Sequence, residues 1–214
     1  MNVRLLIADD HAVIRVGLAN LLAKTDIEII AQAANGEECL KLAEKHKPDV
    51  VLLDVRLPDG DGLEILKKLR LKVPASKVVM LSTYDNPTYV ARAVALGASD
   101  YVLKGSTRKV IVDAILAAAA GESPSSGGEL HSVARMMNTR EVVDDDQTQL
   151  TGRETQVLRH LALGLSNAEV GLSLKISVET VKEHVQNVLR KLAVKDRTQA
   201  AVWAVHKGLV GGMA

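Results

Sequence analysis

Polar residues suited to phosphoryl transfer stand where apolar runs of the sequence end. They are Asp9, Asp10, Asp54, Ser82 and Lys104. Three carboxylates brought together repel one another unless a proton or a cation neutralises them. All-oxygen ligation with room for water suits Mg²⁺ better than Zn²⁺, which prefers His or Cys. With a lysine and a hydroxyl beside them, these groups could transfer a phosphoryl group to Asp54 as the nucleophile, while the metal and Lys104 neutralise its charge.

A regular alternation of elements would bring these residues to one place. Apolar runs predict strands at 3–8, 27–33, 49–54, 77–82 and 100–103. Helical spacing of apolar residues lies between and after them, as in Ile14, Leu18, Leu21 and Leu22, and in Ile111, Ala114, Ile115 and Ala118. Strict β–α alternation predicts a parallel sheet with helices on both faces, whose functional crevice lies at the carboxyl ends of the strands.

A simpler interpretation exists for each residue alone. An Asp after a strand often caps a turn, a Lys there is often a solvated strand end, and His11 fits a surface helix start. Residues at the ends of four different strands make the combined site the stronger interpretation.

The composition limits which classes of protein the chain can belong to. The 214 residues suit two domains, and with no Phe, one Trp and three Tyr the core must consist of Leu, Val, Ile and Ala. The single cysteine, Cys39, excludes an intramolecular disulfide and fits a reducing compartment. The N-terminal apolar run is too short for a signal peptide, and no stretch reaches the ~20 apolar residues of a membrane span. We therefore expect a cytoplasmic protein without membrane association.

The charge is unevenly distributed. Residues 121–149 are rich in Gly, Ser and Asp and carry two Lys/Arg against six Asp/Glu. That composition predicts a linker, with a short helix possible at Leu130–Met137. Residues 150–214 carry nine Lys/Arg against five Asp/Glu, which favours a polyanionic partner.

The C-terminal part reads as helices only. Capping boxes start at Thr151 and Ser166, a further helix starts at Ser177, and "KIS" forms a tight turn before it. This order is typical of a helix-turn-helix unit. In the last helix of that unit one stripe is apolar: Val181, Val185, Val188 and Leu192. The opposite arc is polar and could face a DNA groove: Glu179, Lys182, Glu183, Gln186 and Arg190.

Long ordered motifs carry a family resemblance. "LLIADDH", "VVLLDVRLPDGDGLEIL", "VVMLST" and "GASDYVLKG" resemble the receiver domain of two-component response regulators. The stretch from "LTGRETQVL" to "KDRTQA" resembles a LuxR-type DNA-binding domain, and the pair resembles the NarL/FixJ class. This resemblance implies a flavodoxin-like α/β doubly wound five-stranded parallel sheet followed by a small all-α helix-turn-helix domain. The corresponding ranges are a receiver at 1–120, a flexible acidic linker at 121–147 and a DNA-binding domain at 148–214.

The resemblance also implies roles at the crevice. Asp54 would be the phosphoacceptor, loaded by a sensor histidine kinase. Mg²⁺ would be held by Asp10 directly, by Asp9 directly or through water, by Asp54 and by the backbone carbonyl of Arg56. Lys104 would pair with the phosphoryl group, Ser82 would move to hydrogen-bond it, and Tyr101 would follow inward as the switch.

Two departures bear on this expectation. Many receivers have Pro after the lysine, often through a cis peptide, whereas Gly105 follows here. A cis bond without Pro costs about 3–4 kcal/mol, which leaves the loop geometry open. Arg56 and Tyr84 stand where receivers tune the lifetime of the phosphate.

For the DNA-binding domain, the resemblance implies double-stranded promoter DNA as partner. Lys182, Glu183 and Gln186 are the candidates for base contacts. Asn187, Arg190, Lys191 and Arg197 are the candidates for phosphate contacts. Symmetric half-sites would make the active form a homodimer, with the last helix as one possible seam.

Two other functions compete. A phosphatase with an aspartate nucleophile usually has a second carboxylate two residues on, and position 56 is Arg, so we do not expect an enzyme. A regulator that binds DNA without phosphorylation, using its receiver only as an interaction scaffold, stays open as the alternative.

Overall fold

The computed structural model describes residues 2–83, 85–122, 124, 129–139 and 150–210. Contacts divide the chain into two compact units. The first holds Met1–Asp85 and Leu96–His131, and the second holds Asn86–Ala95 and Ser132–Ala214. Among the described helices, none is both long and apolar enough to cross a membrane.

The first unit is built on a five-stranded parallel sheet. Its strands are β1 (Val3–Ala8), β2 (Ile27–Ala33), β3 (Val50–Asp54), β6 (Lys77–Ser82) and β7 (Asp100–Leu103). They stand in the order β2-β1-β3-β6-β7, which is the flavodoxin-like arrangement. The sequence predicted all five strands, and only the start of the third differs, by one residue.

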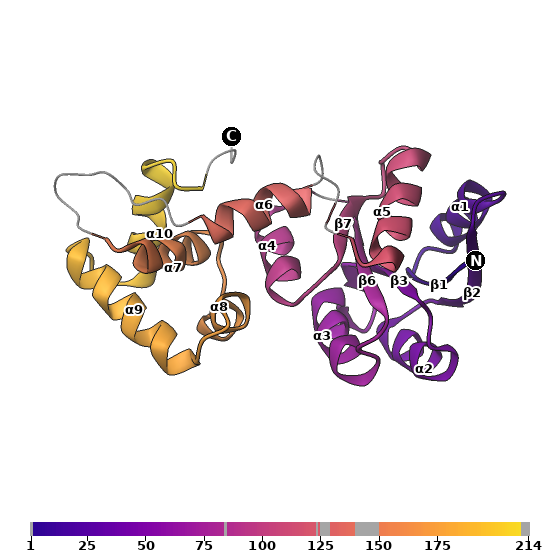
Figure 1. The fold of residues 1–214 in the computed structure, drawn as a ribbon, viewed down its shortest axis with the longest axis horizontal. Helices are drawn as coiled ribbons and strands as arrows, with labels where there is room; N and C mark the ends of the chain where they lie inside the picture. The colour runs from indigo at the N-terminus through magenta and orange to yellow at the C-terminus, as the bar shows by residue number, and fades with distance from the viewer. Residues whose placement is uncertain (1, 84, 123, 125–128, 140–149, 211–214) are drawn as a thin grey trace. The chain divides into compact units, whose positions relative to one another are not determined.

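Helices cover both faces of this sheet. They are α1 (Ala12–Leu22), α2 (Gly36–His46), α3 (Gly62–Lys72) and α5 (Arg108–Ala120). Helices α1 and α5 pack on one face, and α2 and α3 lie on the other (Figure 1). On the α1–α5 face the core consists of aliphatic residues such as Leu5, Leu52, Val79 and Ile115, as a chain without Phe requires.

Two short elements interrupt the alternation after β3. Strands β4 (Arg56–Leu57) and β5 (Gly60–Asp61) pair antiparallel as a small hairpin before α3 begins. The apolar pattern of the sequence did not predict this hairpin, because two-residue strands have no detectable period.

The second unit is helical. Besides α4 (Pro87–Ala95) it contains α7 (Gly152–Ala162), α8 (Asn167–Leu174), α9 (Val178–Lys191) and α10 (Arg197–His206). The predicted capping boxes at Thr151 and Ser166 are present, and the Ser177 side chain caps α9. Between α8 and α9, Lys175 adopts a left-handed conformation and the Ile176 amide donates to the Gly171 carbonyl, which makes the tight helix-turn-helix turn.

A helix also lies inside the segment predicted as linker. Helix α6 (Glu129–Asn138) covers the possible short helix of the sequence. Its C-terminal end is held by α7, since the buried Gln156 and Arg159 side chains donate to the carbonyls of Asn138 and Thr139. The domain boundaries at 120 and 148 remain predictions.

Candidate functional site: the acidic edge of the sheet and the exposed helix α9

The strand ends named in the sequence lie together at one edge of the sheet. Asp9 follows β1, Asp54 ends β3, Ser82 ends β6, and Lys104 follows β7. The Lys104 amide donates to the Ser82 carbonyl across 2.7 Å, which continues the sheet past the last strand and fixes where the lysine side chain starts.

Lys104 forms ion pairs with two carboxylates at this edge of the sheet. Its Nζ lies 2.7 Å from Asp9 Oδ2 and 2.7 Å from Asp54 Oδ2. Burial acts to lower the pKa of Lys104, but the hydrogen bonds and charges of both carboxylates outweigh it and raise the pKa above its ordinary value. Burial raises the pKa of Asp54, although Lys104 and the Arg56 amide act to lower it. The lysine therefore stays charged, while burial disfavours the charged form of Asp54.

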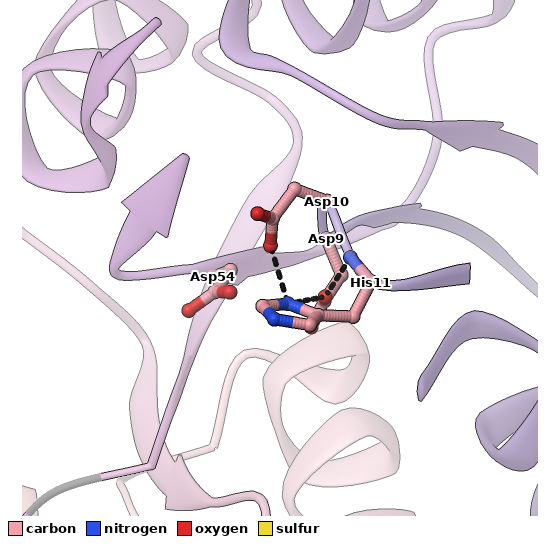
Figure 2. A group of neighbouring side chains, drawn as sticks. All are labelled: Asp9, Asp10, His11 and Asp54. Atoms are coloured by element: carbon pink, nitrogen blue, oxygen red, sulfur yellow. Dashed lines mark hydrogen bonds and ion pairs between the residues drawn. The ribbon is translucent and has the colours of Figure 1, made fainter. Parts of the chain in front are cut away.

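The carboxylates are arranged as a cation site would need them. Asp9, Asp10, His11 and Asp54 each offer one ligand atom, and these atoms lie within 4.8 Å of one another (Figure 2). Asp9 is fully buried and paired with Lys104, while Asp10 beside it is exposed. A set of carboxylate oxygens of which one member faces solvent fits Mg²⁺, which prefers oxygen ligands and keeps several waters.

His11 belongs to this cluster in a way the sequence did not indicate. Its side chain is 66% exposed, as expected of a surface helix start, and its ring gives no cap to α1. Its Nδ1 nevertheless lies 2.5 Å from Asp10 Oδ1, and its amide donates to Asp9 Oδ1 (Figure 2). Its contacts thus hold the two Asp carboxylates in their places.

The loop after Asp54 explains the glycines of the motif. The Arg56 amide donates to Asp54 Oδ1 across 3.2 Å. The Gly62 amide donates to the Val55 carbonyl, and a Cβ on Gly62 would lie 2.0 Å from the Asp54 carbonyl oxygen. Gly60 has a φ of +148°, which other residues rarely adopt. The chain can turn back this sharply after Asp54 only with glycine at these points.

The expected switch residues are both buried. Ser82 is 4% exposed and Tyr101 is 3% exposed. Tyr101 therefore already points inward in this unmodified chain, whereas the resemblance implied an inward movement on phosphorylation. The Lys104–Gly105 peptide is trans. Tyr84 lies outside the described residues.

The predicted base contacts share the exposed side of α9. Lys182, Glu183 and Gln186 are exposed, while Val181 and Val188 are buried on the other side. Lys182 Nζ lies 2.8 Å from Glu179 Oε1. Any base contact by Lys182 therefore requires that this surface ion pair be given up, which costs little in water.

The predicted phosphate contacts differ in what holds them. Arg190 is exposed and donates across one turn of its own helix, to Asn187 Oδ1. Lys191 Nζ instead lies 2.7 Å from Glu154 Oε2, which also closes the capping box of α7. Arg197 donates to the carbonyl of Leu165 before α8. Lys191 and Arg197 thus hold the helices together, a role that sequence reasoning missed because the partners are far away along the chain.

Family models match both parts of the chain. The response regulator receiver domain matches residues 5–116. The model of bacterial regulatory proteins of the luxR family matches residues 148–204.

Individual relatives agree with both matches. The response regulator protein VraR of Staphylococcus aureus is 35% identical over 211 residues, which cover 98% of this chain and all of VraR. The receiver domain of the putative response regulator NarL of Mycobacterium tuberculosis is 35% identical with a TM-score of 0.54, over 56% of this chain and 98% of that one. The response regulator ChrA of a heme-sensing two-component system is 31% identical with a TM-score of 0.53, over 98% and 99% of the two chains.

Proposed function

Because this chain belongs to the two-component response regulators that join a receiver to a LuxR-type DNA-binding domain, we propose that phosphorylation of Asp54 by a sensor histidine kinase switches its binding to promoter DNA. The observation that carries the proposal is the position of Lys104 Nζ, 2.7 Å from both Asp9 and Asp54. A lysine paired with both carboxylates supports the proposal, because its charge could also stabilise a phosphoryl group transferred to Asp54.

Each group at the edge has a part in the transfer. Mg²⁺, held by Asp9, Asp10, Asp54 and the Arg56 carbonyl, would neutralise the phosphoryl oxygens. An oxygen of the Asp54 carboxylate attacks phosphorus, and the bond to the kinase histidine nitrogen breaks. Lys104 then shifts its hydrogen bonds from the carboxylates toward the phosphoryl group, and the Ser82 hydroxyl donates to it.

The DNA-facing part of the proposal rests on α9. Its exposed side would enter the major groove, with Lys182, Glu183 and Gln186 toward base edges. Phosphorylation would promote a homodimer whose two copies of α9 read two half-sites. The proposed outcome is a change in transcription, and we do not expect the protein to be an enzyme.

The test is phosphate incorporation from acetyl phosphate with Mg²⁺, followed on a mobility-shift gel. The wild type is expected to shift, and Asp54→Asn is expected not to shift. Asp113→Asn is a matched control, because Asp113 is an exposed carboxylate of α5 whose ion pair is with Lys109 of its own helix. It should shift like the wild type. Equal DNA affinity of wild type and Asp54→Asn, with and without the phosphodonor, would instead favour the regulator that works without phosphorylation.

A second prediction separates the two neighbouring cations of α9. Lys191→Met is expected to destabilise the helical unit by about 1–2 kcal/mol, because the buried Glu154 carboxylate loses its cation. The pKa of Glu154, which burial acts to raise, is lowered by its hydrogen bonds with Lys191 and Thr151, so the variant should lose this contribution. Thermal unfolding measures the effect.

The DNA readout of the same pair is the salt dependence of binding to a duplex of arbitrary sequence. Arg190→Met should reduce the slope of log affinity against log salt by about 0.9, the value for one phosphate contact. Lys191→Met should leave the slope nearly unchanged. A larger slope change for Lys191→Met than for Arg190→Met would contradict this assignment.

A further inference from the structure

Asp59 stands at the tip of the hairpin that carries Arg56. Leu57 pairs with Gly60, so Pro58 and Asp59 form a two-residue turn between β4 and β5. Pro and Asp suit the two central positions of such a turn. As a turn residue alone, Asp59 would need no further contact.

The Asp59 carboxylate nevertheless bridges to another element. Its Oδ1 accepts from the Gly36 amide at 2.8 Å, and its Oδ2 accepts from the Glu37 amide at 2.9 Å. These are the first two amides of α2, which have no partner within their own helix. The next amide, that of Glu38, is capped locally by the Asn35 side chain. One helix start is thus capped partly from its own sequence and partly from the hairpin.

The start of α2 lies close to both α3 and the hairpin tip. A Cβ at Gly36 would lie 2.5 Å from Ile65 Cδ1 of α3 and 3.3 Å from Asp59 Oδ1. The hydrogen bonds from the Gly36 and Glu37 amides also hold the pKa of Asp59 below its ordinary value, against the opposing effect of burial. The carboxylate is therefore charged and seated against the positive end of the helix.

The base of the same hairpin is fixed at the reactive carboxylate. The Gly62 amide donates to the Val55 carbonyl at 2.8 Å, and the Arg56 amide donates to Asp54 Oδ1. Arg56 thus lies between two anchors, one at Asp54 and one at Asp59. The Asp61 side chain at the end of the hairpin accepts from the Leu63 amide and caps α3, whereas the Asp59 side chain connects the hairpin to α2.

We infer that Asp59 is a positioning residue of the metal site, which holds the backbone carbonyl of Arg56 in place as a ligand by clamping the hairpin tip to the start of α2. The inference rests on the proposed function, since it takes the Arg56 carbonyl as a metal ligand. Residues that orient metal ligands typically change metal affinity by about 10- to 100-fold when removed.

The test is Mn²⁺ binding to the unphosphorylated full chain, measured by EPR, together with thermal unfolding. Mn²⁺ is an oxygen-preferring cation that replaces Mg²⁺ and is visible to EPR. Asp59→Ala is expected to weaken binding roughly tenfold. Asp59→Asn keeps one acceptor oxygen and should recover part of that loss. The matched control is Asn35→Ala, which removes a cap from the same helix without touching the hairpin, and should lower the melting temperature similarly while binding Mn²⁺ within about twofold of the wild type.

The outcomes separate the inference from the proposed function. Asp10→Asn should abolish Mn²⁺ binding, and if it does not, or if the wild type binds no Mn²⁺, the metal site itself is overturned. If Asp10→Asn abolishes binding but Asp59→Ala binds like the wild type, only the inference is overturned. Equal weakening by Asn35→Ala and Asp59→Ala would also overturn it, because the effect would then come from α2 alone. Equal weakening by Asp59→Asn and Asp59→Ala would assign the effect to charge and contradict a clamp.

Discussion

Lys104→Met is expected to lower the free energy of unfolding of the metal-free protein by about 3 kcal/mol and the rate of phosphorylation about 100-fold. The variant leaves Asp9 and Asp54 buried without the cation that lies 2.7 Å from each of them. It also removes the positive charge that would stabilise the transferring phosphoryl group. Urea unfolding and the acetyl phosphate assay measure the two effects separately.

The stability loss of Lys104→Met should increase as the pH rises. Burial raises the pKa of Asp54 in the folded chain, so the folded state holds this proton at pH values where the unfolded state has released it. Stability therefore falls as the pH rises through the window between the unfolded and the folded pKa. Without Lys104 the folded pKa rises further, so the deficit of the variant should be larger at about pH 8 than at about pH 5.

A double variant gives the control for this prediction. Asp54→Asn removes one of the two charges that Lys104 balances, so Asp54→Asn with Lys104→Met should recover part of the stability lost by Lys104→Met alone, while the unpaired Asp9 keeps the rest of the deficit. Asp54→Asn alone should be more stable than the wild type at neutral pH. A deficit that is the same with and without the Asp54 charge would show that the lysine does not stabilise the fold through Asp54.

Gly62→Ala is expected to destabilise the first unit by about 3 kcal/mol or more and to lower its melting temperature by roughly 10 °C or more. The new Cβ would lie 2.0 Å from the carbonyl oxygen of Asp54 and 3.1 Å from the Cα of Val55. Both are backbone atoms at the end of β3, so no side-chain rotation relieves the clash. The hydrogen bond from the Gly62 amide to the Val55 carbonyl would be lost as the loop moves away.

Gly17→Ala is the matched control for Gly62→Ala. Gly17 lies inside α1, and nothing stands within 4 Å of the position of its Cβ. Alanine there should stabilise the protein by about 0.5–1 kcal/mol, because it lowers the backbone entropy lost on folding. A Gly62→Ala variant that melts with the wild type would mean that the loop after Asp54 is free to move.

Much of the first unit follows from local pattern because each strand is a short apolar run with a polar end. Asp54 and Lys104 are 50 positions apart in sequence, yet the rule that parallel strands end at one edge was enough to predict them as neighbours. The sequence likewise predicted the helix starts at Thr151, Ser166 and Ser177, because a capping side chain and its amide lie within three residues of each other.

The remaining contacts could not be predicted because their partners are set by packing. Asp59 caps a helix 23 positions away, although its own sequence context indicates only a turn. Lys191 was predicted to contact phosphate, yet it reaches Glu154 across 37 positions. In both cases a charged residue is held by a partner that only the tertiary fold brings near.

The attachment of α6 to α7 has a consequence for any fragment of the helical unit. Thr139 and Leu150 both belong to the second unit, and the Gln156 and Arg159 side chains donate to the carbonyls of Asn138 and Thr139. A fragment that starts at residue 148 would lack these two acceptors, so the side chains of Gln156 and Arg159, which are buried, would each lose a hydrogen-bond partner. A buried donor left without an acceptor costs about 1–3 kcal/mol, so such a fragment should be less stable than one that starts before α6.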